Sequence, residues 1–538
     1  MLVPAAVSLA VAVALLLAPP DDLARTLPVE DAFYALSVAR EAATGGGITI
    51  DGRTPTNGFQ PLWVALNVPV YALVGGERID GLRLSQVLST LLWLAFAGLL
   101  ALQARDLARR HGLEGRMAAA AAAIVAVGSV SVLRLFRNGL ETGLVLVLLA
   151  AAVIVLDRWT TWSARRIALA GVLLGALAWA RLDAALFALA FGAVVLRRDR
   201  RRAVAPLAAC ALAALLLVPW LAYNVALDGS VVPSGGRSQA GAYDPAHNVA
   251  SALRAIGAWT LAPLLRAGMH LQPVPYTEIL AIAGIALTAL AVRYVRRGRR
   301  LPIGSGTLAL AAYAGLLVGW YTLAFGSWWF LDRYLAPLLL VAVPWLACAL
   351  ERLGRRWTLP ALTGVVLVAN VPVLAVLLTA PHWPPPWWTS PASNLGSHPN
   401  LNHEFQLAWT RAHVREECRV GAFESGTLGY FREEVVNLDG KVNSAALRAR
   451  RAGRSGEYVL RTGIDVMVDI PSEPLHSELG RLGWRRVADM GRYETWVRPG
   501  GAHCLQPQPT EQRARQVAED REDPAQHGRR PHRVGAPA

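Results

Sequence analysis

The sequence predicts an α-helical multi-pass membrane protein with a small α/β domain at its C-terminal end. Of the 538 residues, 54% are hydrophobic and only 17% are charged, whereas about a quarter of the residues in a soluble protein are charged. Up to about residue 380 the chain is a succession of apolar runs, and a helix needs about 20 apolar residues to cross the hydrocarbon core. The composition therefore argues against a water-soluble enzyme.

Eleven apolar segments are predicted to span the membrane. They are residues 2–20, 83–103, 117–133, 140–156, 166–180, 183–196, 203–223, 277–293, 306–326, 334–350 and 358–379. The first is interpreted as a retained span, because it lacks the basic start and small-residue cleavage site of a signal peptide. Residues 61–74 are apolar but short and contain Pro61 and Pro69, which predicts a juxtamembrane or re-entrant helix. If this segment spanned, every later span would be inverted.

The basic residues indicate the orientation of these spans. The net charge is +15, and arginines cluster between the apolar runs. The clusters are Arg105–Arg116, Arg158–Arg166, Arg197–Arg202, Arg293–Arg300 and Arg352–Arg356. With the N-terminus in the cytoplasm, all five fall on the cytoplasmic side, as the positive-inside rule requires. The charge therefore indicates topology rather than a nucleic-acid partner. The single lysine, Lys441, indicates a codon bias toward arginine.

In this orientation the loops 21–60 and 224–276 and the region from 380 onward face outward. Helical patterns at 403–414 and 442–453 alternate with strand patterns at 419–423, 435–438, 465–470 and 493–497. This alternation predicts a small extracytoplasmic α/β domain. We therefore divide the chain into a membrane module, residues 1–380, an outer domain, residues 381–498, and a tail, residues 499–538, whose polar composition predicts disorder.

Two of the four cysteines lie in the polar C-terminal region. Cys418 and Cys504 can form a disulfide if that region faces an oxidising compartment, and the sequence leaves this pairing open. Cys210 and Cys348 lie in apolar runs and are expected to be small core residues.

The first outward loop carries the best candidate for chemistry. Glu30 and Asp31 open a predicted helix, where the partial positive charge of the helix N-terminus favours a carboxylate. Capping of that helix is the alternative role for either acid. A carboxylate held at the bilayer surface is a suitable base for deprotonating a hydroxyl acceptor.

Several motifs of the chain resemble the GT-C class of membrane glycosyltransferases. The acid after the first span and the sequence DGRTPTNGFQPLW at 51–63 are typical of that class. RNGLETGL at 137–144 is similar to a motif of its arabinofuranosyltransferase-like branch, which also resembles family 39. WARLDAALF at 179–187, FLDRYLAPLLL at 330–340 and the segment 426–447 extend the resemblance over most of residues 1–500.

The resemblance implies a GT-C fold and an activity. The expected reaction is the inverting transfer of a sugar from a polyprenyl-phosphate donor to an extracytoplasmic glycan, lipid or protein acceptor, at a bacterial inner membrane. In the class, the acid of the first loop is the general base. That position corresponds to Asp31, with Glu30 as the second candidate. The expected partners are the donor, the acceptor and the bilayer, with no nucleic acid.

The leaving phosphate of such a donor needs cations to stabilise its charge. The candidates are all expected to face outward, Arg40 on the helix of the first loop and the others near the ends of spans: Arg40, Arg134, Arg137, Arg181 and Arg333. An ionisable residue at membrane depth is a functional candidate by default. The alternatives are ion pairs, such as Arg181 with Asp183, or interfacial snorkelling.

Three further residues are candidate substrate contacts: Asn57, Glu141 and Tyr334. Asn57 can equally form an Asn-Gly turn, and Glu141 can ligate a metal or pair with Arg137 one helical turn away, of which the pair is favoured. The outward acids form no convincing cluster, so we predict no cofactor, although some enzymes of the class use a divalent metal and that alternative stays open.

Two other functions remain as alternatives to the transferase. A transporter or lipid flippase would show inverted repeats and broken helices near the midplane, and the sequence reveals neither. A non-catalytic scaffold would act through its outer domain, and its Asp31 would have no catalytic role. The sequence identifies neither the sugar nor the acceptor.

Overall fold

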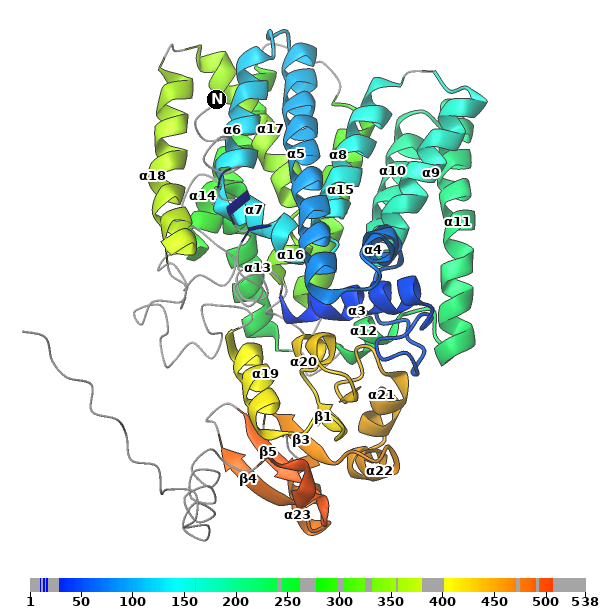
Figure 1. Ribbon diagram of the computed structural model, residues 1–538. Helices are drawn as coiled ribbons and strands as arrows, with labels where there is room; N and C mark the ends of the chain where they lie inside the picture. Colours follow the sequence, from blue (N-terminus) through cyan, green and yellow to red (C-terminus); the bar gives the residue numbers. More distant parts are fainter. Residues whose placement is uncertain are drawn as a thin grey trace, which may run out of the picture.

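The computed structural model consists of a bundle of long helices with a smaller α/β domain packed against one end (Figure 1). It describes residues 29–159, 161–239, 244–261, 277–297, 303–324, 331–354, 357–379, 401–470, 475–489 and 493–506, with a few positions between 10 and 17. The predicted first span therefore lies largely outside the described residues, as does most of the predicted tail.

Every predicted span from residue 83 onward coincides with a helix or a pair of helices. The single helices are α5 (Arg78–Arg110), α8 (Thr142–Arg158), α9 (Ala164–Ala180), α10 (Ala185–Arg198), α11 (Val204–Asp228), α14 (Thr277–Arg296), α15 (Ser305–Leu323), α17 (Leu338–Leu353) and α18 (Thr358–Thr379). Within the described ranges, four helices, α5, α11, α14 and α15, are long and apolar enough to cross a membrane alone. The number of eleven spans stays a prediction.

The span predicted at 117–133 is broken, which corrects the expectation of unbroken helices. α6 (Arg116–Gly128) and α7 (Val130–Arg137) meet at Ser129 with a bend of 63°. A second helix N-terminus at this depth needs acceptors for its free N–H groups. Asn370 Oδ1 of α18 accepts from Val130 N at 2.9 Å, and Ser129 Oγ accepts from Val132 N at 3.4 Å. These side chains stabilise the break and hold α7 at an angle inside the bundle.

Two helices run across the end of the bundle rather than along it (Figure 1). α3 (Glu30–Thr44) begins at the two predicted acids, and α4 (Pro61–Leu73) is the short helix predicted at 61–74, so both helices are confirmed. Of the 15 residues of α3, 10 are buried. The bundle covers one face of α3, while the other packs against the C-terminal domain through Phe33, whose ring lies 5.0 Å from that of Tyr430.

The C-terminal domain is a mixed five-stranded sheet with helices. Its elements are α19 (Leu401–His413), β1 (Val420–Ala422), α20 (Gly426–Phe431), β2 (Val435–Asn437), α21 (Ser444–Arg451), α22 (Ser455–Arg461), β3 (Val466–Asp469), α23 (Leu475–Arg481), β4 (Arg485–Asp489) and β5 (Glu494–Val497). The strand order is β2-β1-β3-β5-β4. β1 is parallel to β2 and β3, and β5 is antiparallel to β3 and β4. The predicted α/β domain and its four predicted strands are confirmed.

A disulfide joins the two ends of this domain. Cys418, just before β1, is bonded to Cys504 in the short helix η5 (Gly501–Cys504), with 5.8 Å between their Cα atoms. The pairing that the sequence left open is therefore present. Residues 499–506, which polar composition assigned to the tail, are ordered up to this bond because the disulfide anchors them to the sheet.

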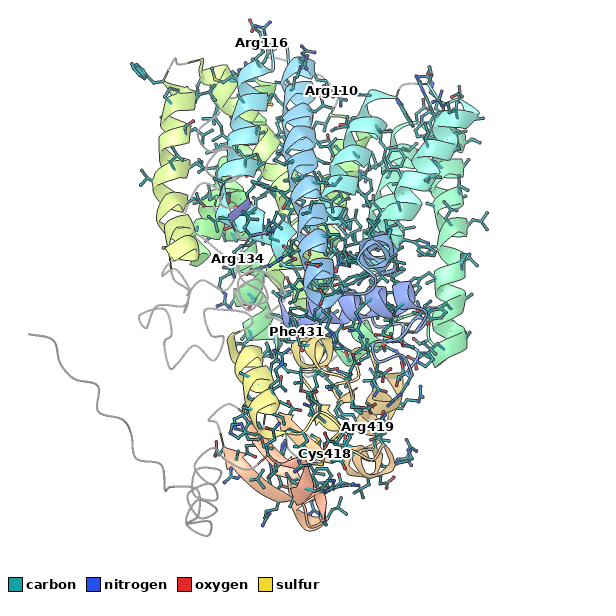
Figure 2. All side chains as sticks on the ribbon, in the orientation of Figure 1. Arg110, Arg116, Arg134, Cys418, Arg419 and Phe431 are labelled. Atoms are coloured by element: carbon teal, nitrogen blue, oxygen red, sulfur yellow. A yellow bond between two sulfur atoms is a disulfide. The ribbon has the colours of Figure 1, made fainter. Side chains whose placement is uncertain are left out.

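The arginine-rich helix ends lie together at the end of the bundle remote from this domain. Figure 2 shows Arg110 and Arg116 at that end and Cys418 at the other. Arg110 pairs with Asp157 at 2.9 Å, which joins α5 to α8 there. Arg198 of α10 donates to Ser305 of α15 at 3.0 Å. The basic clusters are thus separated from the α/β domain by the length of the bundle.

Candidate functional site

The two predicted acids lie at the N-terminus of α3, where the bundle meets the C-terminal domain. The backbone N–H of Val29 donates to Asn138 O at 3.0 Å, which ties the start of α3 to the turn between α7 and α8. Glu30 and Asp31 form the first turn, where the helix dipole favours negative charge. Although adjacent, the two carboxylates face different neighbours.

Glu30 faces the C-terminal domain and anchors it. Its carboxylate accepts a hydrogen bond from Gly426 N, the first residue of α20, and a Cβ at Gly426 would collide with Glu30. Burial raises the pKa of Glu30 well above its ordinary range; Asp31 and Glu424 add to the shift and Lys441 opposes it. Glu30 therefore has the environment of a structural carboxyl group rather than of an ionised base.

Asp31 faces two cations that come from distant parts of the chain. Its Oδ1 lies 2.9 Å from Lys441 Nζ, and its Oδ2 lies 3.6 Å from Arg333 Nη2. Burial would raise the pKa of Asp31, but Lys441 and Arg333 outweigh burial and lower it. Asp31 is therefore an ionised carboxylate at neutral pH, as a general base must be.

Lys441 is a site residue that the sequence did not reveal. It follows β2 in a tight turn, in which Gly440 has φ +81° and Asp439 Oδ1 accepts from Lys441 N at 2.7 Å. Its contact with Asp31 spans 410 residues, so no local pattern could predict it. The available signal was that Lys441 is the single lysine among 53 basic residues.

Asn57 lies in a joint between the two outward loops. It is fully buried, and its Oδ1 accepts from Ser234 N at 3.1 Å. The neighbouring Gly58 packs directly against the carbonyl of Lys441 and leaves no room for a Cβ. Ser234 Oγ donates to the same carbonyl at 2.8 Å. The contact of Asn57 with substrate stays a prediction, but its role in this joint positions Lys441.

Two predicted arginines meet at one aromatic side chain. Arg333 and Tyr334 belong to the short helix α16 (Leu331–Tyr334), and Tyr334 stacks on Tyr321 with 4.3 Å between ring centroids. The guanidinium carbons of Arg181 and Arg333 lie 5.1 and 5.0 Å from the Tyr334 centroid. Through these cation–π contacts Tyr334 connects Arg181 to Arg333, which in turn lies beside Asp31.

Arg181 is a buried cation with unused donors. Its Nε donates to Asp183 at 2.6 Å, the ion pair that the sequence offered as an alternative, and Asp183 also accepts from Tyr321 OH at 2.6 Å. Arg181 is 2% exposed, and the Tyr313 hydroxyl lies beside its guanidinium, but neither terminal nitrogen is within hydrogen-bonding geometry of a described residue. Because buried donors are normally satisfied, this group has the capacity to bind an anion.

The segment 137–144 (RNGLETGL) and the end of α7 supply polar groups near Arg333. Glu141 is buried close enough to Arg333 for its charge to stabilise that guanidinium. Arg137 is fully buried on α7 and donates to Gln86 Oε1 at 2.7 Å and to Thr90 Oγ1 at 2.8 Å, both on α5. Arg134 lies one turn earlier on α7 and is partly buried (Figure 2).

Arg40 lies apart from the other candidates. It is nine residues beyond Asp31 on α3, about 13 Å along the helix axis. Its guanidinium contacts Glu41 at 2.5 Å and Glu433 at 3.5 Å. The structure thus brings Arg333 and Arg181 to the Asp31 cluster and gives Arg40 acidic partners elsewhere.

The comparisons with known proteins show the fold. No protein-family model and no curated protein matches the sequence. Two crystal structures of ArnT from Cupriavidus metallidurans are similar at 14% identity: the apo state (TM-score 0.58, 93% of this chain, 98% of ArnT) and the complex with undecaprenyl phosphate (0.57, 94% and 99%). The chain therefore shares its fold with ArnT. The predicted fold class is thereby confirmed.

A weaker similarity extends to an Archaeoglobus fulgidus oligosaccharyltransferase tethered with an acceptor peptide. Its TM-score is 0.48 at 14% identity, over 87% of this chain and 69% of that protein.

The described ranges contain few groups that could ligate a metal together. One set of three ligand side chains lies within mutual reach there: Cys418, His503 and Cys504. Two of these are joined in the disulfide and are not available to a metal. The question of a divalent metal therefore stays open.

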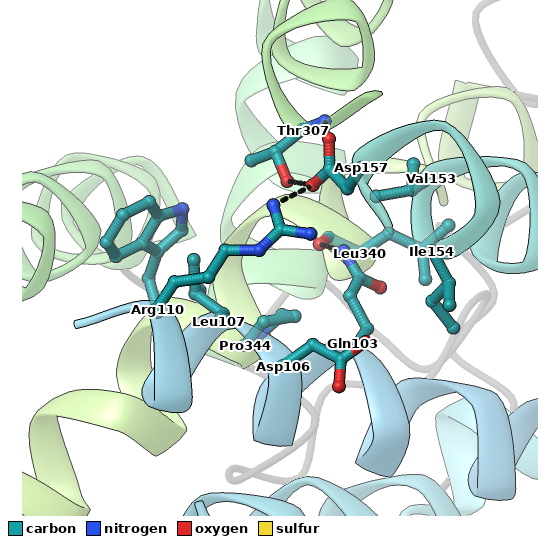
Figure 3. Close-up of a pocket in the computed structure, with 11 residues that line it drawn as sticks. Gln103, Asp106, Leu107, Arg110, Val153, Ile154, Asp157, Thr307, Leu340 and Pro344 are labelled. Carbon is teal, nitrogen blue, oxygen red and sulfur yellow. Dashed lines mark hydrogen bonds and ion pairs between the residues drawn. The ribbon is translucent and has the colours of Figure 1, made fainter. Parts of the chain in front are cut away.

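A second carboxylate–arginine contact lines a pocket at the arginine-rich end (Figure 3). Asp157 Oδ1 accepts from the backbone N–H groups of Gly306 and Thr307 at 2.6 and 3.1 Å, and its Oδ2 accepts from Thr307 Oγ1 at 2.6 Å. Arg110 completes the set at 2.9 Å. Asp157 thus caps the N-terminus of α15, and this structural role accounts for its place beside Arg110.

Proposed function

We propose that this protein is a membrane glycosyltransferase that moves a sugar from a polyprenyl-phosphate donor to an acceptor outside the cytoplasm. The observation that carries the proposal is the position of the Asp31 carboxylate, which lies 3.6 Å from Arg333 and 2.9 Å from Lys441 at the end of a bundle with the GT-C fold. Its fold is shared with ArnT in complex with undecaprenyl phosphate, which supports a lipid-phosphate ligand. Fold alone does not define function, and the residues of the site carry the chemistry.

In the proposed reaction Asp31 is the general base. The acceptor hydroxyl oxygen attacks the anomeric carbon of the sugar while Asp31 takes the hydroxyl proton. The bond from the anomeric carbon to the phosphate oxygen breaks, and polyprenyl phosphate leaves with the bonding electrons. A single displacement inverts the configuration at that carbon. Glu30 has the secondary role of anchoring the domain that supplies Lys441.

The leaving phosphate gains negative charge and needs cations that are already in place. We assign this role first to Arg333 and then to Arg181, because both contact Tyr334 and Arg181 has free donors. Arg134 and Arg137 are proposed as supporting cations on α7. The acidic partners of Arg40 disfavour a direct contact with phosphate.

The proposed orientation places the C-terminal domain outside the cytoplasm of a bacterial cell, with the N-terminus inside. The arginine-rich helix ends lie at the opposite end of the bundle, as expected for the cytoplasmic side. The Cys418–Cys504 disulfide also supports an oxidising compartment.

A donor screen tests this function. Purified protein is mixed with a panel of polyprenyl-phosphate sugars and an envelope extract as acceptor source, and polyprenyl phosphate is quantified by mass spectrometry. We expect one donor to be consumed with release of polyprenyl phosphate. Sugar-free polyprenyl phosphate serves as the binding control. Absence of both binding and consumption across the panel would contradict the proposal.

A further inference from the structure

Lys441 has two features that a general surface cation lacks. It is the one lysine in a chain that uses arginine at every other basic position. Its Nζ lies between Asp31 Oδ1 at 2.9 Å and Asp439 Oδ2 at 3.4 Å. A lysine ammonium is a compact point charge with three donors, whereas a guanidinium is a larger planar fork. The cleft between two carboxylates therefore suits lysine in particular.

The backbone of Lys441 is held from both sides. Gly58 lies against its carbonyl with no room for a Cβ, and Ser234 Oγ donates to that carbonyl at 2.8 Å. A Cβ at Gly440 would meet the backbone of Leu447 at 2.7 Å. Both outward loops of the membrane module thus contact the turn that carries Lys441 and hold its backbone in place. The side chain is consequently aimed at Asp31 by fixed backbone.

Burial would otherwise oppose the charge of Asp31. The acids Glu30, Asp439 and Glu424 lie close to this cluster, and Glu424 pairs with His403 at 3.1 Å. The opposing cations are Arg333 and Lys441, with a smaller contribution from His403. Tyr34 lies beside the ammonium, with its ring centroid 5.9 Å from Nζ. Lys441 is the cation nearest to the Asp31 carboxylate among the described residues.

We propose that Lys441 is the positioning residue of the base: its ammonium holds Oδ1 of Asp31, so that Oδ2 faces Arg333 and receives the acceptor proton. This inference rests on the proposed function and deepens it. The C-terminal domain is then part of the active site rather than an appendage. The short contact to Oδ1 and the longer 3.6 Å contact from Oδ2 to Arg333 leave Oδ2 as the oxygen free to accept a proton.

The decisive experiment measures the ionisation of Asp31 in full-length protein, without any substrate. A water-soluble carbodiimide modifies protonated carboxyl groups, and peptide mass spectrometry quantifies modification of Asp31 against pH. The variants are Lys441→Met and Lys441→Arg, with Arg448→Met as the matched control, because Arg448 also bridges the domain to the bundle, through Asp228 at 2.8 Å.

Lys441→Met is expected to move the onset of Asp31 modification to higher pH by about one unit or more, since a neighbouring opposite charge shifts a carboxyl pKa by 1–3 units. Lys441→Arg retains the charge and should restore most of the shift, and Arg448→Met should leave the onset unchanged. An unchanged onset in Lys441→Met would overturn the inference. So would an equal shift in Arg448→Met, which would indicate general loosening of the interface.

Turnover supplies a second measurement and separates the two proposals. Where the wild type releases polyprenyl phosphate, Lys441→Met should lower kcat at least tenfold with donor affinity within about twofold. In a plot of kcat against pH, Lys441→Met should also move the fall on the acid side to higher pH. Lys441→Arg should return that fall to its wild-type pH, although kcat itself stays reduced. Failure of every donor would contradict the proposed function, while the carbodiimide result would still decide the role of Lys441.

Discussion

The two ends of the bundle each hold an aspartate beside an arginine, but the two aspartates are bound differently. At the arginine-rich end, Asp157 accepts from two backbone N–H groups and a threonine hydroxyl and pairs with Arg110. At the other end, Asp31 is held by the side chains of Lys441 and Arg333, with no backbone donor among the described residues.

This difference separates a structural acid from a reactive one. Asp157 satisfies the free N–H groups of a helix N-terminus, so its lone pairs are engaged wherever the helix exists. Asp31 lies in the first turn of its own helix, and its carboxylate contacts the side chains of Lys441 and Arg333 rather than backbone donors. Only the second arrangement leaves a carboxylate oxygen able to accept a proton. The backbone hydrogen bonds of the aspartate therefore distinguish a structural ion pair, such as that of Asp157, from a reactive one, such as that of Asp31.

Removal of an arginine should weaken binding of polyprenyl phosphate at one end of the bundle and not at the other. Arg333→Gln should weaken binding of polyprenyl phosphate about 10–100-fold, because a charge-assisted hydrogen bond contributes about 1.5–3 kcal/mol. Arg181→Gln should act in the same direction. Arg110→Gln should leave binding within about twofold. Titration of purified protein with polyprenyl phosphate measures all three, and equal losses in the three variants would remove the distinction between the two ends.

For stability, the residues at the arginine-rich end are expected to matter more. Asp157→Ala removes the cap of α15 and isolates Arg110, which should cost about 2 kcal/mol in the free energy of unfolding. Asp106→Ala is the matched control, because Asp106 pairs with Arg158 at the exposed surface and such pairs contribute at most about 1 kcal/mol. Thermal unfolding in detergent gives the comparison. A smaller loss in Asp157→Ala than in Asp106→Ala would contradict the capping role.

A glycine substitution tests the joint between the loops and Lys441. Gly58→Ala places a Cβ against the Lys441 carbonyl and should lower turnover about tenfold by displacing the ammonium from Asp31. Gly98→Ala, in α5, has open space around the added Cβ and should leave turnover unchanged. Assay of released polyprenyl phosphate distinguishes them, and full activity in Gly58→Ala would show that the joint does not position Lys441.

The smallest effect concerns Glu30 and pH. Because its folded pKa is raised above the ordinary value of 4.5, Glu30 contributes stability that is fully present below that value and is lost as pH rises through the raised pKa. Glu30→Gln retains an acceptor for Gly426 N–H and cannot ionise. Its unfolding temperature should therefore fall less than that of the wild type between about pH 4.5 and neutrality. Parallel curves would contradict the assignment.

The sequence predicted the parts of the site that are local. The first turn of α3, its two acids and the helices from residue 83 onward follow from apolar runs and charge positions. Arg333 and Arg181 were identified because charges at outward span ends stand out. The disulfide was one of two open outcomes, and the geometry of the folded domain decided it.

The parts that were missed depend on long-range contacts. Lys441 joins Asp31 across 410 residues and its single occurrence was attributed to codon bias. The break at Ser129 depends on Asn370 from a helix far along the chain. Asn57 has a turn-like local sequence, yet its partner is Ser234 in another loop. Local patterns do not encode such partners, because each is created only when the bundle and the domain pack.

The central claim is that Asp31 is the base, and Asp31→Asn tests it most directly. Donor binding and release of polyprenyl phosphate are measured on the same preparation, with Asp157→Asn as the matched control. If Asp31 is the base, Asp31→Asn should bind donor like the wild type with turnover reduced about 10²–10⁴-fold, and Asp157→Asn should have near-normal turnover. Turnover by Asp31→Asn at the wild-type rate would contradict the account.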